Sequence, residues 1–248
     1  MFRIGANRDL PIIMTIDDDM VSREVVATML TLRGYTVHTA TDGSDALEQL
    51  ESRACIPQVI LMDVQLPGLQ GAELVQRLRK LCNACIYAVS ASCPPEELTS
   101  VTDGFLLKPF SVEALQKLLE GHVTPQAISI PEHGEPVIHP KTLAQFRQMM
   151  PEHMVREVYA AVITDLKKRQ LSLQAAAAEH NAIEVRRIGH AIKGGCGMAG
   201  ALQAARLGAL LEAESDQLYN SAKVLQDLVT ATQNLERMLE KEFPQPKT

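Results

Sequence analysis

The stretch Ile60–Val64, with the sequence ILMDV, and the residues that follow it at 65–68, QLPG, carry the strongest fold signal in the chain. An apolar run of strand length ends on Asp63, and a Pro-Gly pair then turns the chain. Runs that are apolar on both faces and bounded by turn residues are typical of buried parallel strands. Asp63 is therefore expected at the carboxyl end of a strand, where open α/β sheets bind their ligands.

A second strand-like run, residues 11–16, also ends on acidic residues, which are Asp17, Asp18 and Asp19. Two parallel strands that bring carboxylates to the same edge of a sheet would concentrate negative charge there. Such a cluster requires a bound cation, proton uptake, or both. Asp19 is expected to cap the helix that follows rather than to bind a metal, because aspartate is a preferred N-cap residue.

Composition limits the class of protein. The chain has 248 residues, enough for two domains, and its hydrophobic content of 46% is ordinary for a soluble globular protein. No apolar run is long enough to predict a membrane span, and the first residues lack the features of a signal peptide. The net charge of −6 and the lack of a basic stripe argue against nucleic acid as a partner. Five cysteines without framework spacing indicate a reduced, cytoplasmic protein.

Strand-like runs alternate with segments of helical periodicity as far as residue 119. Strands are expected at residues 11–16, 35–40, 58–62, 85–90 and 104–108, and helices at 20–32, 43–53, 72–81, a short segment from 94, and 111–119. Five strand–helix units of this kind predict a doubly wound parallel sheet with right-handed crossovers.

Polar side chains follow these strands in a set order. They are Asp17 and Asp18 after the first strand, Asp63 after the third, Ser90 after the fourth and Lys108 after the fifth. With their neighbours, these residues resemble the signature of a response-regulator receiver domain. The receiver would occupy residues 11–122, after a lead-in at 1–10. The resemblance implies a flavodoxin-like α/β fold, in which the parallel strands have the order 2-1-3-4-5.

The resemblance also implies roles for the acidic residues. Asp63 would be the nucleophile that accepts a phosphoryl group from a donor histidine and forms an acyl phosphate. Asp18, Asp63 and the main-chain carbonyl of Gln65 would hold Mg²⁺, while Asp17 would act largely through a water molecule. Oxygen ligands of this kind suit magnesium, which keeps several waters and bridges to phosphoryl oxygens.

The remaining receiver residues would act on the phosphoryl group itself. Lys108 would form an ion pair with it, and Ser90 would donate a hydrogen bond to it. Ser90 and Phe105 would rearrange together on phosphorylation. The bond between Lys108 and Pro109 is expected to be a cis peptide, since the cis form costs only about 0.5–1 kcal/mol before proline.

Two features depart from the receiver pattern. The segment between Ser90 and Lys108 is short and contains two prolines, so the fourth helix is expected to be shorter by about a turn, which places a standard receiver dimer in doubt. Cys82 and Cys85 have C-x-x-C spacing, but no second pair with metal-ligand spacing follows. We expect a structural role for them, with thiol sensing as a weaker alternative.

Helical patterns replace strands in the second half of the chain. The stretch from Gly121 to His139 lacks periodicity, and the three prolines within residues 123–138 predict a linker there. His122, His133 and His139 lie in or next to this linker, and we expect them to be solvated, with a metal site as the weaker alternative. Residues 139–243 then carry amphipathic patterns, before a tail at 244–248. Helices are expected at residues 143–150, 154–180, 182–202, 204–215 and 221–242. Four long helices with short joins predict an up-down four-helix bundle.

The helix expected at 182–202 has one unusual face. Its apolar residues share a single stripe: Val185, Ile188, Ile192 and Ala199. On an ideal helix His190 points about 170° away from that stripe, which places it toward solvent.

Cations and glycines share the outer face with His190; they are Arg186, Arg187, Lys193, Gly194 and Gly197. The cations would balance the charge of a phosphate, and glycines inside a helix suggest that another protein docks closely there. Residues 189–200, GHAIKGGCGMAG, resemble the motif of a histidine phosphotransfer (HPt) domain. The resemblance implies that His190 is its phosphorylation site.

Together the two resemblances imply a phosphorelay protein of a two-component system. Its partners would be a sensor histidine kinase, another receiver domain, or both, with no nucleic acid, membrane or small-molecule partner beyond a phosphodonor. The chain shows no ATP-binding motif of a kinase, so it would be a phosphotransfer intermediate with autophosphatase activity at most. The alternative is an interaction switch, in which phosphorylation of the receiver exposes or masks the helical domain, and that domain binds and inhibits a kinase or receiver.

Overall fold

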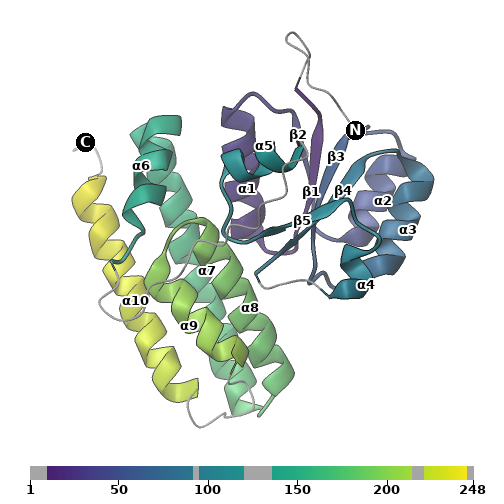
Figure 1. The fold of residues 1–248 in the computed structure, drawn as a ribbon. Coiled ribbons are helices and arrows are strands. Elements are labelled where there is room, and N and C mark those ends of the chain that lie inside the picture. Colours follow the sequence, from purple (N-terminus) through teal and green to yellow (C-terminus); the bar gives the residue numbers. More distant parts are fainter. Residues whose placement is uncertain (1–9, 92–94, 120–135, 214–220, 245–248) are drawn as a thin grey trace. The chain divides into compact units, whose positions relative to one another are not determined.

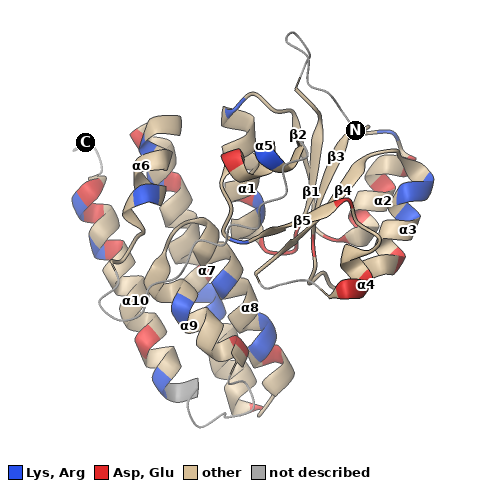
Figure 2. Cartoon of the chain, in the orientation of Figure 1, with Lys and Arg blue, Asp and Glu red and all other residues tan. Residues whose placement is uncertain are grey.

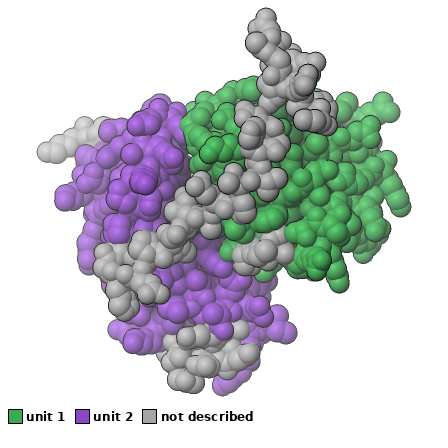
Figure 3. All heavy atoms as spheres, viewed as in Figure 1, with its two compact units in different colours: residues 1–128 green, residues 129–248 purple. Residues whose placement is uncertain are grey.

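The computed structural model describes residues 10–91, 95–119, 136–213 and 221–244. The chain divides into two compact units, residues 1–128 and 129–248, which Figure 3 shows in different colours. The expected linker at 123–138 lies largely outside the described residues, as do the lead-in at 1–10 and the tail at 244–248, while His122 and His133 lie wholly outside them.

The first unit contains a five-stranded parallel sheet with the order β2-β1-β3-β4-β5 (Figure 1). The strands are β1 (Ile13–Ile16), β2 (Val37–Ala40), β3 (Val59–Asp63), β4 (Cys85–Ser90) and β5 (Gly104–Leu107). The helices are α1 (Met20–Leu32), α2 (Gly43–Glu51), α3 (Gly71–Leu81), α4 (Glu96–Thr99) and α5 (Val112–Leu119). Helices α1 and α5 cover one face of the sheet and α2, α3 and α4 the other (Figure 1). The predicted flavodoxin-like sheet is confirmed.

The ends of α1 follow from its sequence. Asp19 is its N-cap, and the side chain accepts a hydrogen bond from the backbone N of Ser22 at 2.6 Å. Gly34 follows the helix with a φ of 88°, a left-handed conformation that glycine adopts without strain. The predictions that Asp19 caps this helix and that the helix stops at Gly34 are both confirmed.

Strand β2 begins later than the sequence predicts, whereas helix α4 is short as predicted. β2 begins at Val37 and not at Tyr35, because the backbone N of Tyr35 still donates to the carbonyl of Leu30 at the end of α1. Helix α4 is four residues long, as the shortened segment before β5 predicted.

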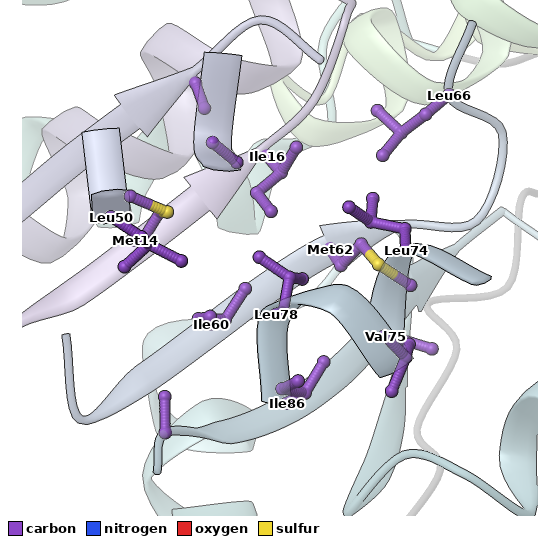
Figure 4. Close-up of a cluster of buried hydrophobic side chains, with 14 of the residues drawn as sticks. Met14, Ile16, Leu50, Ile60, Met62, Leu66, Leu74, Val75, Leu78 and Ile86 are labelled. Atoms are coloured by element: carbon purple, nitrogen blue, oxygen red, sulfur yellow. The ribbon is translucent and has the colours of Figure 1, made fainter. Parts of the chain in front are cut away.

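The main core of this unit lies between the sheet and helices α2, α3 and α4. Met14, Ile60 and Ile86 contribute from three strands, and Leu74 and Leu78 contribute from α3 (Figure 4). All five of these side chains have an exposed fraction of 0%. Burial of apolar area on this scale is the main favourable term in folding.

The second unit is a helical bundle. Its helices are α6 (Pro140–Met149), α7 (Glu152–Ala178), α8 (Ala182–Met198), α9 (Leu202–Ala213) and α10 (Ser221–Glu242). Helix α7 packs against α8 and α10, and α9 also packs against α8 and α10, so these four helices close into the predicted bundle (Figure 1). Helix α6 packs on α7, where Phe146 lies with its ring centroid 6.1 Å from that of Tyr159.

Two details of the bundle differ from expectation. Helix α8 ends at Met198 rather than at 202, because Gly200 has a φ of 72° and the backbone N of Ala201 turns back to the carbonyl of Cys196 at 2.8 Å. His139, expected in the linker, is the N-cap of α6, and its side chain accepts a hydrogen bond from the backbone N of Thr142.

Replacing Leu74 with alanine is expected to lower the free energy of unfolding by about 2–5 kcal/mol, because the substitution leaves a cavity in the main core. Leu81, on the same helix and 41% exposed, provides the control. Leu81→Ala should cost less than about 0.5 kcal/mol, as is usual at exposed positions. Urea unfolding of the full chain measures both, and equal losses would contradict the core described here.

Candidate functional site

Three carboxylates gather at the carboxyl ends of β1 and β3. Oxygen atoms of Asp17, Asp18 and Asp63 all lie within 4.8 Å of one another. Strands β1 and β3 are parallel neighbours, and Ile16 pairs with Met62, so the residues that follow them arrive side by side. Asp17 and Asp63 are buried whereas Asp18 is exposed. The expected concentration of negative charge is present at this edge of the sheet, where Figure 2 shows acidic residues in red.

Lys108, which directly follows β5, neutralises part of this charge. Its Nζ lies 2.6 Å from Oδ2 of Asp63 and 2.7 Å from Oδ2 of Asp17. Burial by itself would lower the pKa of Lys108, but the two carboxylates raise it above its ordinary value. Lys108 therefore carries a positive charge at neutral pH. The peptide bond between Lys108 and Pro109 is cis, as predicted.

Two groups besides Lys108 also hold the carboxylate of Asp17. Its Oδ1 accepts a hydrogen bond from the backbone N of Asp19 at 2.9 Å, and its Oδ2 accepts one from the hydroxyl of Ser22 at 2.7 Å. Ser22 has an exposed fraction of 0% and was not identified from the sequence. Its position in the first turn of α1, five residues after Asp17 and three after the expected Asp19 cap, is the signal that could have identified it.

The other predicted receiver residues are Gln65, Ser90 and Phe105. The backbone N of Gln65 donates to Oδ1 of Asp63 at 2.9 Å, which ties the loop after β3 to the carboxylate. Ser90 is buried at the end of β4, where its carbonyl accepts a hydrogen bond from the backbone N of Lys108 at 2.7 Å. Phe105 pairs with Ala88 in the sheet and packs, half-buried, against the main core.

The acidic cluster fits a divalent cation. Hard oxygen donors from three carboxylates within 4.8 Å match what Mg²⁺ prefers, and Asp18 reaches the exposed side of the cluster. Asp17 accepts hydrogen bonds from three protein donors, Asp19, Ser22 and Lys108, whereas Asp63 accepts them from two, Gln65 and Lys108. Asp17 therefore has less capacity left for direct coordination of a metal. Asp18 and Asp63 are the carboxylates best suited to contact a metal.

His190 lies in the second unit, and its environment differs from the prediction. The residue is 8% exposed, so the expectation that it points to solvent was wrong. That expectation assumed one packed side of α8, but α8 packs against both α7 and α9. The contact with α9 includes Gly189, which has no apolar side chain and so leaves no mark in the hydrophobic pattern.

His190 belongs to a polar cluster with two charged residues. Nδ1 of His190 lies 2.9 Å from Oε1 of Glu212 on α9, and Nζ of Lys193 lies 3.1 Å from Oε2 of the same carboxylate. The hydrogen bond from His190, together with those from Lys193, lowers the pKa of Glu212 to about 2. An ionised carboxylate only accepts hydrogen bonds, so Nδ1 of a neutral His190 carries the proton. The lone pair of that ring is then on Nε2.

Glu212 is the main site residue that sequence reasoning missed. It follows His190 by 22 residues and lies on a different helix, so no local spacing links the two. The only sequence signal is an acidic residue close to the end of a mostly apolar helix.

The residues predicted to form a docking face divide into two groups. Arg186 and Arg187 are exposed, and Lys193 is half-buried, in line with the charge seen along α8 in Figure 2. Arg187 forms a bidentate ion pair with Glu184. Gly194 and Gly197 are buried, which is contrary to their expected place on a bare outer face.

The cysteines show no feature of a redox or metal site within the described residues. Cys82 and Cys85 are half-buried free thiols, and Sγ of Cys82 lies 3.4 Å from the carbonyl of Leu78 at the end of α3. Burial raises the pKa of Cys55, which contacts the same core as Cys82, to about 11. A raised pKa disfavours the reactive thiolate.

Comparison with known families agrees with the sheet and acidic cluster of the first unit and with the helical bundle of the second. The family model of the response regulator receiver domain matches residues 13–120, and the model of the Hpt domain matches residues 141–241. The chain is a receiver domain joined to an Hpt domain. This is the fusion that the sequence motifs predicted, and both domains are those of two-component phosphorelay proteins.

Individual relatives match only part of the chain. The sensor histidine kinase RcsC of Salmonella typhi is 35% identical over 119 residues, which are 46% of this chain and 12% of RcsC. The response regulator MprA of Mycobacterium ulcerans is 35% identical over 108 residues, which are 42% of this chain and 46% of MprA. The chain thus spans less than half the length of either curated relative.

Among solved structures, the chemotaxis response regulator CheY4 of Vibrio cholerae is 30% identical, with a TM-score of 0.38 over 45% of this chain and 97% of CheY4. Within the described residues, no helix has the length and apolar content needed to cross a membrane.

Replacing Lys108 with methionine is expected to lower the stability of the receiver by about 3–5 kcal/mol when no divalent cation is present, because two buried carboxylates lose their cation. Millimolar Mg²⁺ should then stabilise the variant more than it stabilises the wild type. Thermal unfolding with and without Mg²⁺ measures this. The exposed Lys80 gives the control Lys80→Met. An equal effect of Mg²⁺ on the wild type, Lys108→Met and Lys80→Met would contradict the pairing of Lys108 with the two carboxylates.

The lowered pKa of Glu212 predicts a pH dependence for the Hpt domain. A carboxyl whose folded-state pKa lies below its ordinary value stabilises the fold above that ordinary value, and the contribution is lost as the pH falls. Stability should therefore decrease between pH 4.5 and about 2, the ordinary and lowered pKa values of this carboxyl. Glu212→Gln should flatten this part of the stability curve, whereas Glu240→Gln at an exposed position should not. Unfolding by urea across this pH range tests it.

Proposed function

We propose that this chain is a phosphorelay intermediate that accepts a phosphoryl group on Asp63 and exchanges one through His190. The observation that carries the proposal is the buried carboxylate of Asp63, held by Lys108 within a cluster of oxygens that suits Mg²⁺. Phosphoryl transfer depends mainly on positioning and on neutralising charge, and this arrangement supplies both.

At the receiver, an oxygen of Asp63 attacks the phosphorus of a donor phosphohistidine. A bond between that oxygen and phosphorus forms, the bond between phosphorus and the donor nitrogen breaks, and the electron pair stays on the donor imidazole. Lys108 lies 2.6 Å from Asp63 and so can follow the negative charge onto the phosphoryl group, while Ser90, buried at the end of β4, would donate a hydrogen bond to it. Bound Mg²⁺ would supply further positive charge next to the phosphoryl oxygens.

At the Hpt domain, Nε2 of His190 is the attacking atom. Its lone pair is available because the proton is on Nδ1, where Glu212 accepts it in a hydrogen bond at 2.9 Å. The bond from Nε2 to phosphorus forms while the bond from phosphorus to the carboxylate oxygen of a partner receiver's acyl phosphate breaks, and the electron pair stays on that carboxylate. The ring gains positive charge in this step, and the ionised Glu212 stabilises that charge. Lys193, whose Nζ lies 3.1 Å from the other oxygen of Glu212, would help to balance the charge of the phosphoryl group.

The partner that docks beside His190 is proposed to be a sensor histidine kinase domain or another receiver. Arg186 and Arg187 are exposed one turn before His190, where they would meet the acidic edge of a receiver. Ile183, which is 84% exposed, lies seven residues before His190 and therefore on the same side of the helix. An exposed apolar side chain flanked by cations is suited to a protein interface.

Phosphorylation of separate variants tests the proposal. Asp63→Asn should abolish labelling of the receiver by acetyl phosphate or a cognate kinase, and His190→Gln should abolish onward transfer to a partner receiver. The matched controls are Asp45→Asn and His153→Gln, because both residues lie outside the two sites. Labelling that persists in Asp63→Asn, or onward transfer that persists in His190→Gln, would refute the corresponding half of the proposal.

A second function is favoured by one observation, the low exposure of His190 at 8%. In this interaction switch, phosphorylation of Asp63 would expose or mask the Hpt domain, which would bind and inhibit a kinase or receiver without using His190. A chase of radiolabel from a phosphorylated partner separates the two functions. Acid-labile, base-stable phosphate at His190 supports the relay, and binding without such phosphate supports the switch.

A further inference from the structure

Two glycines face each other where α8 and α9 cross. A Cβ atom built on Gly208 would lie 2.5 Å from the backbone N of Lys193 and 2.7 Å from the carbonyl oxygen of Gly189. A Cβ atom built on Gly189 would lie 2.7 Å from the backbone N of Glu212. Ordinary contacts of a Cβ atom begin at 3.4 Å, so the two backbones touch at a distance that only glycine allows on both sides.

This contact lies directly beside the polar cluster around His190. Gly189 precedes His190 by one residue and Lys193 by four, while Gly208 precedes Glu212 by four, which is one helical turn. The backbone of Glu212 thus lies against that of Gly189, and its carboxylate reaches both Nδ1 of His190 and Nζ of Lys193. The distance between the two helix backbones therefore determines whether Glu212 reaches the ring.

We propose that Gly208 is a positioning residue for His190: the absence of a side chain at 208 sets the separation of α8 and α9 that holds Glu212 on Nδ1. The proposal rests on the phosphotransfer function proposed for His190, to which it adds the element that fixes the reactive form of the ring. Gly208 itself touches neither the ring nor a phosphoryl group.

The distances leave little room for a wider separation. A methyl group at position 208 would lie 2.5 Å from the backbone N of Lys193, and an ordinary contact is at least 3.4 Å. The two atoms would therefore have to move apart by roughly 0.9 Å. The hydrogen bond between His190 and Glu212 is 2.9 Å long, and a shift of that size along it would exceed the range of such bonds. The neighbour that must yield is the backbone of α8, not the flexible end of a side chain.

Nitrogen NMR of ¹⁵N-labelled His190 in the full chain tests the proposal, because the shifts of the ring nitrogens report which one carries the proton. Gly208→Ala should increase the population with the proton on Nε2 and slow phosphotransfer through His190 by at least about tenfold. Ala209→Gly is the matched control. It weakens α9 through the lower helix propensity of glycine but adds no collision at the crossing, so it should leave the ring unchanged.

Two further variants separate positioning from general damage. Glu212→Ala should give the same ring spectrum as Gly208→Ala, and the double variant should be no slower than Glu212→Ala, because both changes act through one hydrogen bond. Glu212→Asp keeps the backbone and the charge but shortens the side chain, so it should also release Nδ1. It decides the question even if Gly208→Ala does not fold.

An unchanged ring spectrum in Gly208→Ala or in Glu212→Asp would overturn the proposal, as would additive losses in the double variant. Failure of the phosphotransfer function itself would be recognised separately. In that case wild-type His190 would take up no phosphate, although the ring spectra would still respond to Gly208→Ala and Glu212→Asp.

Discussion

The receiver depends on one buried electrostatic arrangement, the ammonium group of Lys108 between the carboxylates of Asp17 and Asp63. Lys108 and Asp17 directly follow β5 and β1, and Asp63 is the last residue of β3. Lys108 is separated from Asp17 by 91 residues and from Asp63 by 45. Buried charges are costly unless they are paired, so the sheet must close with these strand ends together or leave unpaired charge inside. The same arrangement pairs Asp63, the carboxylate that we propose as the nucleophile, with a buried cation.

The Hpt domain holds the group that we propose as its phosphate acceptor by a related principle, with an acidic neighbour in place of a basic one. In the receiver a cation holds the carboxylate of Asp63, whereas in the Hpt domain the carboxylate of Glu212 holds the imidazole of His190. A second group then restrains each partner: Asp17 restrains Lys108, and Lys193 restrains Glu212. In both units the group proposed to accept phosphate is thus oriented by a charged neighbour that is itself fixed. Preorganisation of this kind lowers the cost of reaching the transition state.

Sequence patterns located most elements of the fold, for physical reasons that are local. Strand β4 and helices α1 and α10 have the predicted bounds, because apolar periodicity is interrupted sharply by caps and turns at their ends. At two of the bounds that differ from the prediction, a backbone hydrogen bond crosses the end of an element. Tyr35 remains bonded to the end of α1, which delays β2, and Gly200 turns the chain back, which ends α8 early.

The sequence alone determined the two domain types, the carboxylates, lysine and serine at the strand ends, and the histidine on its helix. These follow from the order of short motifs, and parallel strands necessarily bring their ends to one edge. Only the tertiary structure decided what surrounds those residues, namely that Ser22 holds Asp17, that Glu212 holds His190, and that His190 is buried. The reason is that periodicity records apolar faces, whereas α8 and α9 meet here through the bare backbones of Gly189 and Gly208, which carry no hydrophobic signal.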